Sequence, residues 1–252
     1  MRAADFLLAA AALPVLDLDA LTGGGGLVVV APHPDDESLG CGGLIAEARA
    51  RGRPVRVVVV SDGSGSHPNS PSHPPERLRD LREGEARDAA RALGLDPGHV
   101  RFLRLPDRQV PSAGPEAEAA AEAIVEVVRE SGAGALFVSW EHDPHCDHVA
   151  SAAIARLAHR RVPDARLYAY PVWGLTLPDD AEVGGPPRGA RLAVGPHRAA
   201  KASAIAAHRS QTTALIDDDP TAFRLDPAML ARFAGPYETF FEGEPAAGEG
   251  GA

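Results

Sequence analysis

Histidine and carboxylate side chains are concentrated in two short clusters, at residues 33–37 (HPDDE) and 142–148 (HDPHCDH). A hydrolytic metal site needs about three protein ligands and one position open to water, and imidazole and carboxylate groups suit a borderline ion such as zinc. One His and one Asp of the first cluster, with one His of the second, would supply this set. A remaining carboxylate could then take the proton of a water molecule made acidic by the metal. The residue types therefore indicate metal-assisted hydrolysis.

Each cluster taken alone also has a purely structural explanation. An Asp at the start of a helix caps the first turn and interacts favourably with the helix dipole. Histidines are also common in solvated surface loops. The spacing does not decide which Asp binds the metal, and the two clusters gain weight as a pair only if the fold brings them together.

Buried strands precede both clusters. Residues 27–31 (LVVVA) and 135–140 (ALFVSW) have the apolar character of strands that are covered on both faces. Further strands are predicted at 55–61, 100–105 and 166–171, and helices at 38–51, 76–93, 116–129 and 148–159. This alternation predicts a Rossmann-like α/β three-layer sandwich with a mostly parallel central sheet. In the doubly wound strand order 3-2-1-4-5 the two clusters meet at the carboxyl edge of the strands, where we expect the metal site.

Length and composition indicate one main domain. The chain has 252 residues, of which 44% are hydrophobic, and α/β proteins of this size commonly fold as a single domain. We expect an N-terminal extension over residues 1–26, a single domain over 27–241 and a flexible tail over 242–252. The Ser-, Pro-, Gly- and His-rich segment 62–75 follows a predicted strand and could act as a lid.

Charge and cysteine content limit the partners and the compartment. A formal charge of -10 without a Lys/Arg run argues against nucleic acid or anionic membrane as partner. The wide separation of Cys41 and Cys146 favours a reducing, cytoplasmic compartment. An apolar stretch follows Arg2 as in a secretory signal, but Asp5 interrupts it, and we expect a short external helix. No apolar run approaches the ~20 residues of a membrane span. The sequence does not decide whether the protein forms a homo-oligomer.

The motifs resemble those of the LmbE-like or PIG-L-like zinc-dependent N-acetylglucosaminyl deacetylases. The resemblance rests on APHPDDESLGCGG at 31–43, on HCDH at 145–148 and on the pattern RxxExxxAxxxLG at 82–94. It covers most of residues 27–158. It implies a Rossmann-like fold and zinc-dependent removal of an acyl group, usually acetyl, from the nitrogen of an amino sugar or glycoconjugate. The partner would then be a small molecule.

The same resemblance implies the metal ligands and the base. His33, Asp36 and His148 would bind zinc, although Fe2+ or another divalent transition ion would also suit these groups. Asp35 would be the general base that activates the attacking water.

The resemblance also implies roles for residues around the metal. His145 would polarise the carbonyl oxygen or protonate the leaving amine, and Asp147 would orient His145. Arg82 and Asp107 match positions that contact the sugar. The segment 201–211 is similar to a C-terminal helix of the family.

Two other functions fit the same residues. Two histidines and one carboxylate also form the facial triad that holds Fe(II) in oxygenases, which would make the chain an oxidoreductase. Those sites usually lie in β-rich barrels, which argues against this alternative on a parallel sheet. A non-catalytic carbohydrate-binding relative is the second alternative, but binding alone would require neither Asp35 nor His145. The sugar, the aglycone and the acyl chain are not encoded in these motifs.

Overall fold

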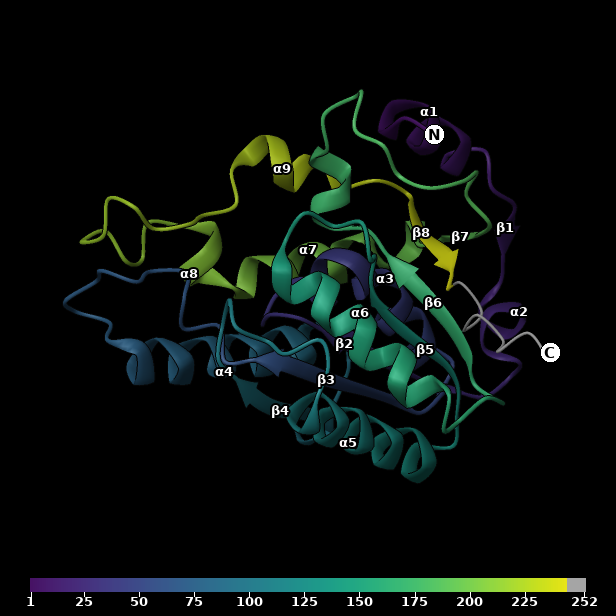
Figure 1. Cartoon of the computed structure of the whole chain (residues 1–252), viewed down its shortest axis with the longest axis horizontal. Helices are drawn as coiled ribbons and strands as arrows, with labels where there is room; N and C mark the ends of the chain where they lie inside the picture. The colour runs from purple at the N-terminus through teal and green to yellow at the C-terminus, as the bar shows by residue number, and fades with distance from the viewer. Residues whose placement is uncertain (244–252) are drawn as a thin grey trace.

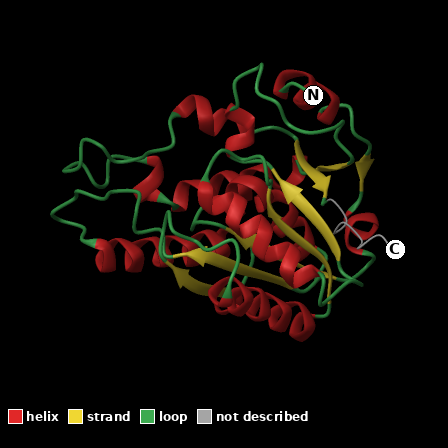
Figure 2. Ribbon diagram, viewed as in Figure 1, coloured by secondary structure: helices red, strands yellow, loops and turns green. Residues whose placement is uncertain are grey.

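The computed structural model describes residues 1–243, which form a central sheet with helices on both faces (Figure 1, Figure 2). The strands are β1 (Val15–Leu16), β2 (Gly26–Ala31), β3 (Val55–Ser61), β4 (Val100–Leu105), β5 (Ala133–Ser139), β6 (Arg166–Tyr170), β7 (Gly189–Ala193) and β8 (Tyr237–Glu242). The α-helices are α1 (Ala3–Ala10), α2 (Leu18–Thr22), α3 (Asp36–Ala50), α4 (Pro75–Ala92), α5 (Pro115–Ser131), α6 (Cys146–His159), α7 (Arg198–Ala207), α8 (Arg209–Thr212) and α9 (Pro227–Arg232).

The sheet has eight strands in the order β1-β7-β8-β6-β5-β2-β3-β4. Strands β4, β3, β2, β5 and β6 are parallel neighbours. They are the five strands predicted from the sequence, and they lie in the doubly wound order. The prediction of a Rossmann-like, mostly parallel α/β fold is therefore confirmed. Because β2 pairs directly with β5, with Val30 opposite Val138, the segments that follow these two strands leave the sheet side by side.

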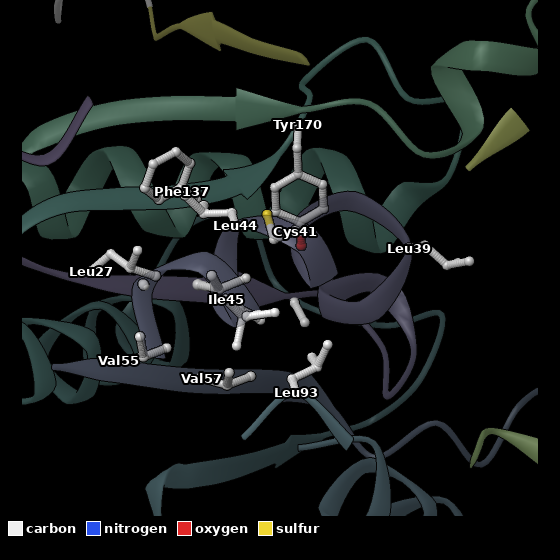
Figure 3. Packing of buried hydrophobic residues seen from close by; sticks show 14 of the residues in the cluster. Leu27, Leu39, Cys41, Leu44, Ile45, Val55, Val57, Leu93, Phe137 and Tyr170 are labelled. Atoms are coloured by element: carbon white, nitrogen blue, oxygen red, sulfur yellow. The ribbon is translucent and has the colours of Figure 1, made fainter. Parts of the chain in front are cut away.

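Apolar side chains on both faces keep β2 buried along its whole length. Leu27 belongs to the cluster on the α3 side, with Leu44 of that helix and Phe137 of β5 (Figure 3). Val28 belongs to the opposite cluster, with Ile124 of α5. Successive side chains of a strand point to opposite faces, so a continuous apolar run is what a strand covered by helices on both sides requires.

The sequence did not predict β1, β7 and β8. Strand β8 runs antiparallel to both β6 and β7, and β1 pairs with β7. Residues 1–26 thus contribute a strand to the main sheet besides α1 and α2, and Phe6 of α1 stacks on Trp140 with ring centroids 4.8 Å apart. Of the predicted tail, Glu242 ends β8, while residues 244–252 lie outside the described residues. No helix within residues 1–243 is long and apolar enough to cross a membrane.

The segment 201–211 is not one helix. His208 separates α7 from α8 with backbone angles φ -78° and ψ 61°, which lie outside the helical region. Its Nε2 atom lies 3.1 Å from Glu37 Oε1 and 3.2 Å from Ser38 Oγ. The break therefore directs a fully buried imidazole at the first turn of α3.

Helix α3 packs so closely on the sheet that a side chain at Gly40 would collide with Tyr170. A Cβ atom at Gly40 would lie 2.1 Å from Tyr170 Cδ2, and the Tyr170 hydroxyl is held by a 2.8 Å hydrogen bond to Val30 O. Gly40→Ala is expected to lower the free energy of unfolding by about 1–3 kcal/mol, the usual range for overpacking. Urea unfolding would measure it.

Gly84 of α4 is the matched control, because a Cβ atom there would meet nothing within 4 Å. Gly84→Ala should raise the free energy of unfolding by about 0.5–1 kcal/mol through helix propensity. Equal effects of the two substitutions would contradict the close approach of α3 to Tyr170.

Candidate active site

The turn between β2 and α3 has a strained backbone at Asp35. Its angles are φ 145° and ψ -29°, a region that costs a non-glycine residue about 1–3 kcal/mol. Two contacts hold the turn: Asp35 N donates to Glu37 Oε2 at 3.1 Å, and Arg82 Nη2 donates to Pro34 O at 2.8 Å. The surrounding structure therefore forces Asp35 into a conformation that the residue would not adopt by itself.

Asp36 brings two imidazoles together. Its Oδ2 atom lies 3.2 Å from His33 Nδ1 and 3.2 Å from His148 Nε2. The other ring nitrogen of His148, Nδ1, lies 2.9 Å from Asp143 Oδ2. His148 Nε2 is buried and has no hydrogen-bond partner among the described residues. A buried nitrogen lone pair beside a carboxylate, on a ring fixed by a second carboxylate, is the arrangement of a metal-binding histidine.

His33 has the same arrangement. Its Nε2 atom lies 3.1 Å from Asp147 Oδ2 and 3.4 Å from Asp107 Oδ1, on the side of the ring away from Asp36. Carboxylates at Nε2 favour the tautomer with the proton on that atom, which leaves Nδ1 free to accept a metal. The expected metal ligands His33, Asp36 and His148 therefore lie together, around an Asp36 Oδ2 atom that also accepts from His33 N at 2.9 Å.

The position of Asp147 differs from the expectation that its carboxylate orients His145. The carboxylate faces His33 and also accepts from Arg108 N at 2.6 Å and Val110 N at 3.2 Å. The carboxylate thus makes no hydrogen bond to His145 among the described residues. It is the backbone N–H of Asp147 that reaches His145, at 3.2 Å from Nδ1.

His145 presents its other nitrogen as a donor. Because Nδ1 accepts the N–H of Asp147, the proton of the neutral ring resides on Nε2. Burial lowers the pKa of His145, and the neighbouring His33 and His148 lower it further. The ring centroid of His145 lies 4.6 Å from that of His33 and 5.3 Å from that of His148. A neutral N–H donor thus lies next to the candidate metal ligands.

Electrostatics in this cluster favour a cation. Burial alone would lower the pKa of His148, but Asp36 and Asp143 raise it to about 9. Burial would raise the pKa of Asp36, yet the two imidazoles outweigh it and hold that pKa well below its usual range. Carboxylates that favour a proton on these rings also favour a divalent ion in place of the proton.

The donor atoms allow other ligand sets. His33, His145 and His148 offer atoms within 4.8 Å of one another, and so do His33, Asp107 and Asp147 on the Nε2 side of His33. Cys146 also forms such a group with its two neighbours, but its side chain is exposed. The site can therefore bind a metal. A set with Asp107 and Asp147 would use His33 Nε2, whereas the set with Asp36 would use His33 Nδ1.

Asp35 has the properties of a general base. Burial raises the pKa of its carboxyl to about 6, against the opposing charge of Arg82, whose Nη2 lies 3.2 Å from Asp35 Oδ2. A carboxylate with a pKa near the working pH is suited to exchange protons. The guanidinium of Arg82 also donates to Gly63 O at 2.8 Å. Arg82, which was expected to contact the sugar, is thus hydrogen-bonded to other groups of the protein.

A cavity of about 370 Å³ is lined by Asp35, His145 and two of the three expected metal ligands, His33 and Asp36. Its polar lining also includes the expected sugar contacts Arg82 and Asp107. Its apolar lining consists of Leu39, Pro144, Trp173, Phe223 and Leu225. The cavity therefore offers surfaces of both kinds beside the candidate metal ligands.

Several residues of the site were not predicted. Asp143, which contacts His148 Nδ1, lies within the second cluster, and a carboxylate five residues before the candidate ligand His148 was the available signal. His208 and Gln211 belong to the segment 201–211, which the resemblance indicated without giving it a role. His208 contacts Glu37, and Gln211 donates from Nε2 to Ser66 Oγ at 3.2 Å in the cavity wall.

Residues 28–159 match the model of the PIG-L family, described as GlcNAc-PI de-N-acetylase. A probable N-acetyl-alpha-D-glucosaminyl L-malate deacetylase 2 of Bacillus cereus is 28% identical over 197 residues, covering 76% of this chain and 86% of the relative. A 1D-myo-inositol 2-acetamido-2-deoxy-alpha-D-glucopyranoside deacetylase 1 of Saccharopolyspora erythraea is 30% identical over 242 residues, covering 73% and 77%.

The solved structure of the conserved protein TT1542 from Thermus thermophilus has the same fold. It superposes with a TM-score of 0.63 at 26% identity and covers 87% of this chain and 95% of that one. The family match spans the two motif clusters and the strands that bring them together. The chain therefore belongs to the GlcNAc-PI de-N-acetylase (PIG-L) family, as the resemblance of its motifs indicated.

Proposed function

We propose that this protein is a zinc-dependent amide hydrolase that removes an acetyl group from the nitrogen of an amino sugar or glycoconjugate. Family membership and the two deacetylase relatives support the reaction class. The observation that carries the metal dependence is the position of Asp36 Oδ2, 3.2 Å from each of two imidazole nitrogens whose rings are held from behind by carboxylates.

His33 Nδ1, Asp36 Oδ2 and His148 Nε2 would hold the ion. The unpartnered, buried His148 Nε2 supports this fit. When bound, zinc supplies Lewis acidity toward the amide carbonyl and lowers the pKa of water. Asp143 and Asp147 would keep the two rings in the tautomers that leave these nitrogens free.

The proton transfers would belong to Asp35. Its carboxylate would take a proton from the attacking water as the oxygen bonds to the acetyl carbon, and would return that proton to the nitrogen as the C–N bond breaks. Acetate and the free amine are the products, so one water is consumed. The strained backbone of Asp35 supports this role, because such strain persists where the surrounding structure enforces a reactive position.

His145 would stabilise the charge that develops on the carbonyl oxygen. Its Nε2–H donor is fixed by the hydrogen bond that Nδ1 accepts from Asp147 N. A preorganised donor at such a position commonly contributes about 10²–10³ in rate. A protein that only binds carbohydrate would need neither this donor nor a strained carboxylate.

Acetate release is the direct test of this function. The zinc-loaded protein would be incubated with N-acetylglucosamine, its methyl and phenyl glycosides and its inositol and malate glycosides, and products would be followed by mass spectrometry. We expect equimolar acetate and amine from at least one of these substrates, and loss of release after chelation. Absence of release from the whole panel with zinc- and iron-loaded protein would reject the proposal.

Asp143→Asn is expected to weaken zinc binding about 10- to 100-fold, the usual effect of losing a carboxylate behind a metal-binding histidine. Asp143 Oδ2 accepts from Val172 N and Trp173 N as well as facing His148 Nδ1. An amide supplies one acceptor oxygen for these donors and cannot hold the ring as firmly. Competition with a zinc-sensitive dye would measure the affinity.

Asp226→Asn is the control, since that carboxylate caps α9 by accepting from Met229 N at 2.7 Å and is not among the residues that line the cavity. It should leave zinc affinity unchanged. If Asp143→Asn also kept the wild-type zinc affinity, His148 would not need this carboxylate to bind the ion.

A further inference from the structure

Two aromatic side chains form an apolar wall in the active-site cavity. The rings of Trp173 and Phe223 meet edge to face with centroids 5.2 Å apart, and both residues line the cavity. Phe223 is 38% exposed, whereas Trp173 is half-buried and packs on the main core. An exposed Phe ring beside a polar active site offers a surface for an apolar group of a ligand.

The wall is fixed relative to the candidate metal ligands. Trp173 N donates to Asp143 Oδ2 at 3.0 Å, and the same oxygen lies 2.9 Å from His148 Nδ1. One buried carboxylate therefore sets both the ring of His148 and the turn that carries Trp173. A group bound on the wall would lie at a defined distance from the reacting amide, which is what specificity by position requires.

Two interlocked loops fix the Phe223 side of the wall. Phe223 N donates to Ser66 O at 2.9 Å. Further out, Asp218 accepts from Ser70 Oγ at 2.6 Å, and Asp219 accepts from Asn69 N at 2.8 Å. The segments before α4 and before α9 accordingly project from the body side by side (Figure 1). The predicted lid segment thus forms a preorganised rim together with the loop that carries Phe223.

Asp107 and Trp173 lie on different sides of the candidate metal ligands. Asp107 follows β4, whereas Trp173 follows β6, and the candidate ligands follow β2 and β5, which lie between those two strands in the sheet. Phe223 is joined to the Asp107 side, because its N–H donates to Ser66, whose neighbour Gly65 donates to Asp107 Oδ2 at 2.8 Å. A sugar held at Asp107 would therefore extend toward Trp173, with Phe223 beside both.

We infer that Trp173 and Phe223 form a subsite for an apolar aglycone, linked to the amino sugar through its anomeric oxygen. This inference rests on the proposed function for the position of the sugar. The anomeric carbon is bonded to the carbon that carries the acetamido nitrogen, so an aglycone starts next to the reacting amide. Trp173 likewise lies next to a candidate metal ligand, because Asp143 joins it to His148, and Phe223 extends the wall to the exposed mouth of the cavity. An aromatic or alkyl aglycone is the class that such a wall favours over a charged or polyhydroxylated one.

Binding of free-amine products tests the subsite without turnover. Isothermal titration calorimetry on the zinc-loaded protein would compare the phenyl and methyl glycosides of glucosamine, in both anomers. We expect the phenyl compound to bind about tenfold more tightly, as one buried aromatic contact allows. Phe223→Ala and Trp173→Ala should reduce this ratio to near one, whereas Trp173→Phe should largely preserve it.

Leu8→Ala is the matched control, because Leu8 is 75% exposed on α1 and does not line the cavity. It should leave the ratio unchanged. A ratio that survives Phe223→Ala would overturn the subsite. The subsite would also be overturned if the disaccharide of glucosamine, which is polar, gained as much affinity from Phe223 as the phenyl glycoside does. The same holds if the effect of Phe223→Ala on turnover varied with the acyl chain of the substrate and not with its aglycone.

The outcomes separate the two proposals. Acetate release with equal binding of phenyl and methyl glycosides would overturn the subsite and leave the proposed deacetylation standing. Preferential, Phe223-dependent binding of the phenyl glycoside without acetate release from any substrate would support the subsite and overturn the proposed deacetylation.

Discussion

Asp35→Asn is expected to lower kcat for deacetylation about a thousandfold, within the usual range for a general base. The amide is almost the same size as the carboxyl and can still face Arg82, whose Nη2 lies 3.2 Å from Asp35 Oδ2. It cannot take up a proton from water at neutral pH. Zinc content should stay near one ion per chain. Initial rates of acetate release and elemental analysis on the same sample would measure both quantities.

Asp5→Asn, at an exposed position on α1, is the matched control and should have wild-type turnover. Near-normal turnover of Asp35→Asn would exclude Asp35 as the base. Loss of zinc in that variant would instead assign Asp35 to the metal ligands. The two measurements together therefore distinguish a proton-transfer role from a metal-binding role for this carboxylate.

His148→Ala should lose both the metal and the activity. The substitution removes one of three ligands and leaves Asp36 without one of the two imidazoles that hold its pKa down. Zinc content after dialysis should fall from about one ion per chain to near zero, and turnover should fall to background, because catalytic zinc sites typically have three protein ligands. The heat-denaturation midpoint would show whether the variant is folded.

His142→Ala is the control from the same sequence cluster. His142 is exposed, and its ring packs on Trp140 with centroids 5.0 Å apart, outside the active-site cavity. It should retain metal and turnover. If His148→Ala kept stoichiometric zinc and full activity, His148 could not be a ligand, and another of the candidate ligand sets would have to hold the ion.

The central sheet was predictable because its strands carry their own signal. β2, β3 and β5 are apolar on both faces, so their burial is written in a continuous run of side chains. β1 has two residues, β7 lacks a continuous apolar run, and β8 pairs antiparallel on both sides. Their place depends on tertiary pairing and not on a local pattern, and for this reason the sequence did not predict them.

The candidate site was predictable only as far as its motifs extend. The convergence of His33, Asp36 and His148 follows from neighbouring strands and could be expected. The side of the ring that Asp147 faces, and the contact of His208 with Glu37, depend on the conformation of turns and on a helix break. The aromatic wall could not be expected either, because the position of Phe223 comes from hydrogen bonds between two long loops.

The most direct test of the metal site is to determine which of the two ring nitrogens of His33 binds the ion. Anomalous diffraction at the zinc edge from crystals of the zinc-loaded protein should give one strong peak. We predict that it lies about 2.0–2.2 Å from His33 Nδ1, Asp36 and His148 Nε2. A peak on the opposite side of His33, bonded to Nε2 together with Asp107 and Asp147, would contradict the account.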